Sequence, residues 1–152
     1  RGAAEAGHQV EKIFLERQAH QLLHGMQRMQ HVRQTLPRKK DDAAEVVEKM
    51  IAADVIVMAT PVYFYTMSAQ MKTLIDRCCA RYLEIKTRSS TSLSPPPKNV
   101  PMMERTIDGF RGFLDCLEEP KECGTIYGVG AWKVADKRQA SMHEAYEMGK
   151  KV

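Results

Sequence analysis

Cysteine is scarce in this sequence, and its spacing argues against two common roles. The four cysteines are Cys78, Cys79, Cys116 and Cys123, and no two of them have the C-x-x-C spacing. Zinc sites and disulfide frameworks usually show such pairs or a regular spacing. We therefore predict no metal site, and reduced thiols that mostly fill the core of a cytoplasmic protein.

Long apolar runs and blocks of like charge are also missing. No apolar run approaches the roughly 18 residues that a membrane span needs. The net charge is only +4, and the basic residues are dispersed except at positions 38–40, which run directly into two aspartates. We therefore predict neither a membrane nor a nucleic-acid partner. A signal peptide is not seen, and the chain starts at Arg1 without Met, so we expect an upstream segment to be missing.

What is present is the composition of a globular domain. The chain has 152 residues, of which 43% are hydrophobic and 28% are charged, which is typical of one domain with a real core. We predict a single domain over residues 1–152. Two tracts, 17–37 and 87–99, are predicted to be irregular or disordered inserts because they lack the apolar periodicity of the remainder.

Helical and strand-like patterns alternate along the chain. The β-branched run at 54–59 is typical of a parallel strand that helices cover on both faces. The alternation favours a three-layer α/β domain with a parallel sheet. Helices are predicted at 41–53, 67–85, 102–118 and 141–152, with the tail of another at 1–7, and strands at 8–15, 54–59 and 124–132.

The segment after strand 54–59, "TPVYFYTMSA", is rich in aromatic residues, whereas such connections are normally small and polar. Ligands of open parallel sheets bind at the carboxyl ends of the strands. Tyr63, Phe64 and Tyr65 could therefore form a wall for a planar aromatic ligand, with backbone amides bonding its polar edge. The alternative is that these rings pack under the loop or against a partner subunit.

A longer segment carries a resemblance to a known family. Residues 53–82, "ADVIVMATPVYFYTMSAQMKTLIDRCCARY", resemble the core signature of the NAD(P)H-dependent FMN reductase family, close to its iron-sulfur flavoprotein branch. The later "GFRGFLDCL" and "YGVGAW" are similar to that family's later helix and last strand. The resemblance implies a flavodoxin-like sheet of order 2-1-3-4-5 that binds FMN at its switch point. It also implies a homo-oligomer, either a dimer or a tetramer.

The same resemblance implies a cofactor site and a function. The protein would pass a hydride from NAD(P)H to FMN and on to an acceptor, and no side-chain acid or base is required because the chemistry belongs to the cofactor. Lys72 and Asp76 match the motif, but we interpret them as surface and interhelix ion-pair residues. The residues that the resemblance places against the flavin ring are Thr60, Pro61, Val62, Tyr63 and Phe64.

Three elements of that family are missing from this sequence. They are the first strand with its G-S-x-R-x-x-G-x-T phosphate loop, the C-x-G-C-x-x-C segment, and the fourth strand, where "TRSSTSLSPPPKN" stands instead. We therefore expect an incomplete sheet in which the first strand is absent and a Ser/Pro loop replaces the fourth. Strand 54–59 would lack neighbours. FMN binding by this chain would be weak or lost without the phosphate loop.

Two of these gaps have a common explanation at the level of the gene. Shifting the reading frame across "SSTSLSPPP" can give E-F-Y-F-I-I-T-A-A, an apolar strand that ends in small residues. In the other shifted frame, the Met-Gln pairs at 26–27 and 29–30 each contain a cysteine codon, and the tract can read N-Y-C-T-G-C-N-A-C. Our hypothesis is a frameshifted gene or gene model, and resequencing the gene across both tracts tests it.

Two alternatives to a flavin enzyme remain open. His20 and His24 could share a helix face, with His31 nearby, but no carboxylate or third ligand is placed with them. We therefore predict a solvated helix or loop there. A second alternative is a non-catalytic α/β remnant or dimerisation module without bound flavin, which flavin-dependent oxidation of NAD(P)H would exclude.

Overall fold

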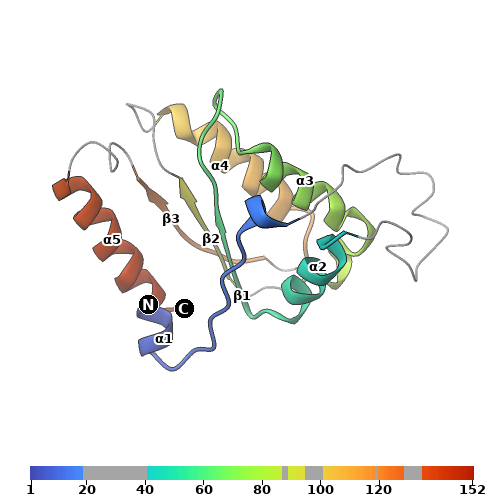
Figure 1. Cartoon of the computed structure of the whole chain (residues 1–152), viewed down its shortest axis with the longest axis horizontal. Coiled ribbons are helices and arrows are strands. Elements are labelled where there is room, and N and C mark those ends of the chain that lie inside the picture. The colour runs from blue at the N-terminus through green and yellow to red at the C-terminus, as the bar shows by residue number, and fades with distance from the viewer. Residues whose placement is uncertain (19–40, 87–88, 95–100, 119, 129–134) are drawn as a thin grey trace.

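The computed structural model describes residues 1–18, 41–86, 89–94, 101–118, 120–128 and 135–152 (Figure 1). Its centre is a three-stranded parallel sheet of order β1-β2-β3. The strands are β1 (Val55–Ala59), β2 (Ser89–Ser94) and β3 (Glu122–Tyr127). The predicted α/β class with a parallel sheet is confirmed.

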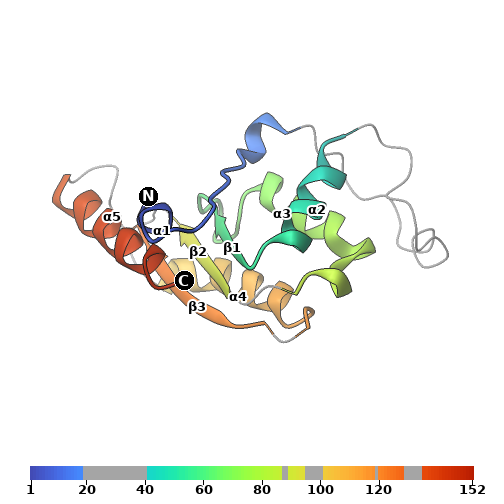
Figure 2. The ribbon, with the colours of Figure 1, turned by 90° about the horizontal axis from the view of Figure 1, so that it is seen from below.

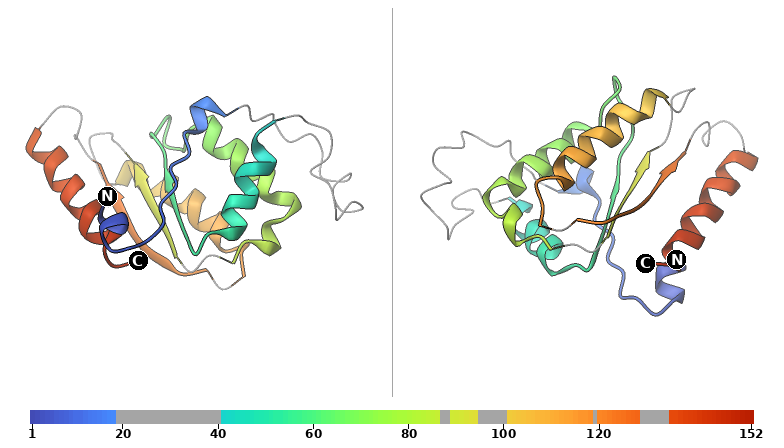
Figure 3. Two further views of the ribbon diagram at one scale, coloured as in Figure 1. Left: turned by 60° about the horizontal axis from the view of Figure 1, so that its bottom comes forward. Right: turned by 180° about the vertical axis from the view of Figure 1, so that it is seen from behind.

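Helices cover both faces of this sheet. Figures 1 and 2 show α2, α3 and α4 on one side of the strands, with α5 and the short α1 on the other. The same three layers are visible from two further directions in Figure 3. The α-helices are α1 (Gly2–Glu5), α2 (Ala43–Ala52), α3 (Ala69–Arg77), α4 (Pro101–Leu114) and α5 (Ala135–Gly149), and the 3-10 turns are η1 (Leu15–Arg17), η3 (Cys78–Ala80) and η4 (Tyr82–Glu84).

The main core lies between the sheet and the layer formed by α2, α3 and α4. Val47, Ile107 and Phe110 are at most 2% exposed, and each such side chain stabilises the fold by about 1.5–3 kcal/mol relative to an exposed one. Alternation along β1 turns Met58 into this core, whereas Val57 is 54% exposed. The second face of the sheet is therefore less completely covered at β1.

A buried ion pair connects α3 to the segment before α2. The guanidinium of Arg77 donates to both carboxylate oxygens of Asp41, at 2.6 and 3.2 Å. The two side chains are only 6% and 1% exposed. Because both charges are removed from water, the pairing offsets part of the cost of burying them.

The two ends of the chain lie side by side where α1 packs against α5 (Figure 1). The hydroxyl of Tyr146 donates to a carboxylate oxygen of Glu5 at 2.5 Å. This bond is the largest of the causes that lower the pKa of the Glu5 carboxyl. A Cβ atom at Gly2 would overlap the carbonyl oxygen of Tyr146, so glycine is required at this contact.

The Ser/Pro tract contradicts one prediction. Ser89–Ser94 is not a loop but the central strand β2, with Val57 opposite Thr91 on one side and Gly124 opposite Thr91 on the other. Interstrand hydrogen bonds are made by the backbone, so a Ser/Thr-rich segment can pair as long as it lacks proline. The prolines begin at Pro95, after the last paired residue. The expectation that β1 lacks a neighbour is therefore also wrong.

The pairing of β2 with β3 contains a bulge. Ser90 lies opposite Glu122, but the next residue, Thr91, lies opposite Gly124, so Cys123 is an extra residue in β3. Gly124 has a φ of 155°, which is rare for residues with a side chain. Met148 of α5 packs closely against this glycine, since a Cβ there would lie 2.7 Å from the Met148 methyl carbon.

The predicted strand at 8–15 is wrong. Among the described residues none pairs with this segment, which is irregular until η1 begins at Leu15. Its alternation is imperfect: Val10 is 56% exposed, whereas Ile13 and Leu15 pack against the core. The segment is held by the contact of η1 with α3 and not by pairing with a strand.

Several local predictions differ in detail. The long helix expected at 67–85 ends at Arg77 and continues as the turns η3 and η4. Lys72 and Asp76 form an ion pair within α3 and not between helices. Only Cys78 is a buried core thiol, because Cys79 is half-buried and the other two, Cys116 and Cys123, are exposed.

Residues 19–37, including His20, His24 and His31, and residues 95–99 lie outside the described residues.

Candidate functional site

Residues 60–68, here called the aromatic loop, connect the carboxyl end of β1 to the start of α3. All three strands run parallel, so their carboxyl ends meet at one edge of the sheet. This is the edge at which open α/β sheets bind ligands. The loop is therefore in the place where the sequence predicted a site.

The base of the aromatic loop is fixed by one buried hydroxyl. Thr60 is 2% exposed, and its Oγ1 accepts a hydrogen bond from the amide of Ser68 at 2.9 Å while donating to the carbonyl of Pro61 at 2.9 Å. Ser68 in turn caps α3 by accepting from the amide of Met71 at 3.3 Å. Ser68 is therefore the N-cap of α3, and the two ends of the loop are held together.

The tip of the loop is a two-residue hairpin turn made of aromatic residues. The amides of Tyr63 and Thr66 donate to each other's carbonyls at 2.9 and 3.0 Å. Between them, Phe64 and Tyr65 have φ values of 50° and 66°. A turn with two positive φ values favours Asn-Gly, and each bulky residue there costs roughly 1–2 kcal/mol. The backbone therefore does not explain why aromatic residues occupy these positions.

The rings of this turn are open to solvent. Tyr63 is 59%, Phe64 99% and Tyr65 45% exposed. Aromatic side chains usually bury most of their surface, and a cluster of exposed ones commonly marks a binding surface. The amides of Phe64 and Tyr65 have no hydrogen-bond partner among the described residues.

Helix α4 supports the aromatic loop. Met67, 6% exposed, packs so closely on this helix that a Cβ at Gly109 would lie 3.0 Å from the Met67 methyl carbon. One turn earlier, the guanidinium carbon of Arg105 lies 5.4 Å from the centroid of the Tyr65 ring. The positive charge of Arg105, which belongs to α4, therefore lies beside the Tyr65 ring of the loop.

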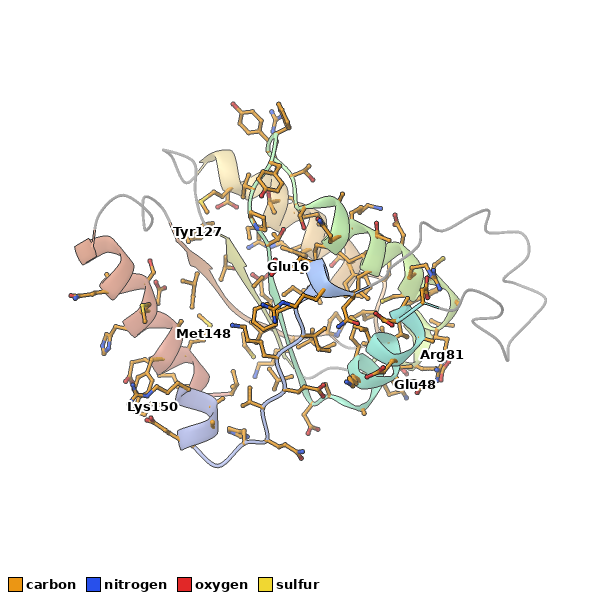
Figure 4. The ribbon with its side chains drawn as sticks, in the orientation of Figure 1. Glu16, Glu48, Arg81, Tyr127, Met148 and Lys150 are labelled. Atoms are coloured by element: carbon orange, nitrogen blue, oxygen red, sulfur yellow. The ribbon has the colours of Figure 1, made fainter. Side chains whose placement is uncertain are left out.

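A tyrosine marks the same edge of the sheet at the end of β3 (Figure 4). The hydroxyl of Tyr127 donates to a carboxylate oxygen of Glu104 at 2.7 Å. Partial burial, together with this hydrogen bond to a carboxylate, raises the pKa of Tyr127 to about 12. Tyr127 is therefore a neutral hydrogen-bonding group at physiological pH and not a base.

A cavity of about 150 Å³ lies elsewhere, between residues 11–18 and α2. The ammonium of Lys49 sits there, 2.6 Å from Glu11 and 2.8 Å from Glu45. The hydrogen bond to Glu11, followed by that to Glu45, raises the pKa of Lys49. Because this cation is already compensated and the cavity is small, we place the candidate site at the aromatic loop.

Within the part of the chain that the structure describes, no three His, Cys, Asp or Glu side chains gather as metal ligands. No helix in the described ranges has the length and apolar character for crossing a bilayer.

The structure places the predicted site residues in two groups. Thr60 is buried and its hydroxyl is used within the loop, and Pro61 and Val62 are half-buried. Tyr63 and Phe64 are exposed at the tip. Sequence reasoning missed Arg105 beside the loop. A helix that follows a parallel strand begins at the carboxyl edge of the sheet, but the sequence predicted a loop and not the strand β2 before α4.

Two solved structures share this fold. One is an azoreductase from Bacillus anthracis, with a TM-score of 0.53, 15% identity, and coverage of 72% of this chain and 62% of that one. The other is a Trp repressor binding protein from Bacillus subtilis, with a TM-score of 0.51, 17% identity, and coverage of 72% and 74%. At such identities the likeness concerns the fold, which is flavodoxin-like as predicted.

Sequence relatives are named as iron-sulfur flavoproteins. That of Methanosarcina thermophila is 29% identical over 117 residues, which are 74% of this chain and 61% of the relative. That of Methanocaldococcus jannaschii is 51% identical over 41 residues, 27% of this chain and 21% of the relative. The chain thus spans less than two thirds of the length of either relative.

A family model described as NADPH-dependent FMN reductase matches residues 1–94, which are more than half of the 152 residues. The match includes β1, the aromatic loop, α3 and β2. The matched residues thus contain two of the three parallel strands and the loop at their carboxyl edge. The protein is therefore a member of the NADPH-dependent FMN reductase family.

Proposed function

We propose that this chain provides the flavin-ring site of an FMN-dependent NAD(P)H oxidoreductase. The family to which it belongs and its flavoprotein relatives support a flavin-dependent oxidoreductase at the family level. The residues proposed to lie against the isoalloxazine ring are Thr60, Pro61, Val62, Tyr63 and Phe64.

The single observation that carries this proposal is the exposed aromatic turn at the carboxyl end of β1. Phe64 is 99% exposed in a backbone conformation that disfavours it. A flat ligand that stacks on such side chains would bury them and offset the cost of the turn. Nearby unpaired amides could donate to the carbonyl and nitrogen acceptors at the polar edge of a flavin.

The residues present fit the ring of FMN better than its phosphate. The ring has exposed aromatic partners on the loop, whereas the family's phosphate loop is not among these 152 residues. When bound, FMN would accept a hydride from NAD(P)H and pass electrons to an acceptor. The chain's own contribution is to orient the ring and to shield one face of it from water. We therefore propose weak FMN binding by this chain alone.

Titration of the purified chain with FMN tests the proposal directly. Flavin fluorescence should be quenched on binding, and Phe64→Ala should weaken the binding because the most exposed ring is removed. Phe14→Ala is the matched control, since Phe14 is also partly exposed, at 38%, but belongs to the segment before η1. Absence of flavin binding at millimolar FMN, or equal loss in both variants, would contradict the proposal.

A second candidate function is a subunit interface built on the same exposed rings. The observation that favours it is again the exposure of Phe64, which a partner subunit would also bury. Sedimentation at several concentrations separates the two. If Phe64→Ala abolishes self-association and flavin binding is absent from the wild-type chain, the interface function is the correct one. A homo-oligomer that also binds FMN would satisfy both proposals.

A further inference from the structure

Arg105 carries a positive charge that has no counter-ion among the described residues. The two acidic residues of α4 that flank it, Glu104 and Asp108, both pair with Arg111, at 3.7 and 3.5 Å. Glu104 also accepts the hydrogen bond of Tyr127. Among the described residues no carboxylate lies within ion-pair distance of Arg105, which is exposed. Its charge is therefore available to a ligand.

The position of this guanidinium is restrained by an aromatic ring. It lies over Tyr65, with 5.4 Å between its central carbon and the ring centroid. Stacking of this kind holds the plane of the guanidinium while leaving its N–H donors free at the edges. Such donors match the oxygens of a phosphate in a two-pronged arrangement. Tyr65 thus orients an anion-binding group at the turn that also carries Tyr63 and Phe64.

We propose that Arg105 binds a phosphate group of the nucleotide whose ring lies on the aromatic loop. This inference rests on the proposed flavin function and deepens it, because it names the group that recognises the charged part of the ligand. A nucleotide joins a flat ring to a phosphate through a sugar or ribityl spacer. The exposed rings of the turn would take the flat ring, and the guanidinium over Tyr65 would take the phosphate. The phosphate belongs either to FMN or to the nicotinamide nucleotide, and these sources are distinguished below.

The test compares ligands with and without a phosphate. Riboflavin has the flavin ring but no phosphate, so its binding reports on the aromatic loop alone. We expect Arg105→Gln to weaken FMN binding about tenfold, the loss of one charge-assisted hydrogen bond, and to leave riboflavin binding unchanged. Arg105→Lys should restore part of the loss, since it keeps the charge. If FMN binding is unchanged but the KM for NADPH rises about tenfold, the phosphate is that of the nicotinamide nucleotide.

Arg17→Gln is the matched control, because Arg17 also lies over an aromatic ring, with 4.7 Å to the centroid of Phe14, but in η1. It should change neither FMN nor NADPH binding. The inference is overturned if Arg105→Gln leaves both nucleotides unaffected, or weakens riboflavin and FMN equally, while wild-type binding is intact. If the wild-type chain binds neither riboflavin nor FMN, the proposed function itself fails, and the role of Arg105 fails with it.

Discussion

The two central residues of the hairpin turn provide the sharpest stability test. Phe64 and Tyr65 both have positive φ values, which cost roughly 1–2 kcal/mol each for bulky residues. The double variant Phe64→Asn, Tyr65→Gly supplies the sequence that such turns favour. Phe64 is 99% exposed, so its removal loses almost no packing. Tyr65 gives up its contact with Arg105, worth about 0.5–1 kcal/mol at an exposed site.

The expected net gain in the free energy of unfolding is therefore about 1–3 kcal/mol. Urea denaturation followed by circular dichroism measures it, and thermal unfolding should show a Tm higher by about 2–4 °C per kcal/mol. Flavin binding should fall in the same variant because both rings are lost. A variant that is no more stable than the wild type would refute the reasoning that these residues are strained.

Three further predictions concern the framework around the site. Asp41→Asn should lower the free energy of unfolding by about 3–5 kcal/mol, because it removes the carboxylate that faces the buried charge of Arg77. In urea denaturation, the double variant Asp41→Leu, Arg77→Met should recover most of that loss, and an unstable double variant would contradict the account. Burial raises the pKa of the Cys78 thiol to about 12. Iodoacetamide should therefore label the exposed Cys116 in the native protein but Cys78 only after unfolding, and mass spectrometry detects the label. The raised pKa of Tyr127 means that its neutral form is favoured by folding, so stability should fall as the pH rises from about 10, where the unfolded tyrosine ionises, to about 12. Tyr127→Phe should remove this part of the pH dependence, and an unchanged profile would show that Tyr127 is not the group responsible.

Much of the fold could be predicted from local patterns. The run of β-branched residues at 54–59 and the apolar face of α2 each indicate one structure strongly. Ser68 was identifiable as a cap because its side chain can accept from the helix that follows it. These features depend on neighbours along the chain, which is the information that a sequence provides directly.

The errors arose where contacts across the fold decide the outcome. Ser89–Ser94 has no apolar pattern of its own, yet it forms a strand because backbone groups of β1 and β3 are available on both sides. Conversely, residues 8–15 contain apolar side chains but have no partner strand among the described residues, so they remain outside the sheet.

The site shows the same limit. The aromatic residues at 63–65 were visible in the sequence, but their exposure and backbone conformation were not. The burial of Thr60 depends on Ser68, eight residues later. The place of Arg105 beside Tyr65 depends on how α4 packs across the sheet. The resemblance to a family could point to the loop, but not to a side chain contributed from another helix.

The extra residue in β3 has a consequence that concerns the length of the chain. Side chains alternate between the two faces of a strand, and the extra residue interrupts this alternation at one place in β3. Beyond it, Gly124 and Ile126 share the face that α5 covers, whereas Tyr127 packs against the main core and meets Glu104 of α4. Ser90 and Thr91, the partners of Glu122 and Gly124, are already consecutive, so deleting Cys123 would leave Ile126 opposite Leu93 and Tyr127 opposite Ser94. At this point we expect the sheet to tolerate the loss of one residue, whereas a side chain at Gly124 would meet Met148.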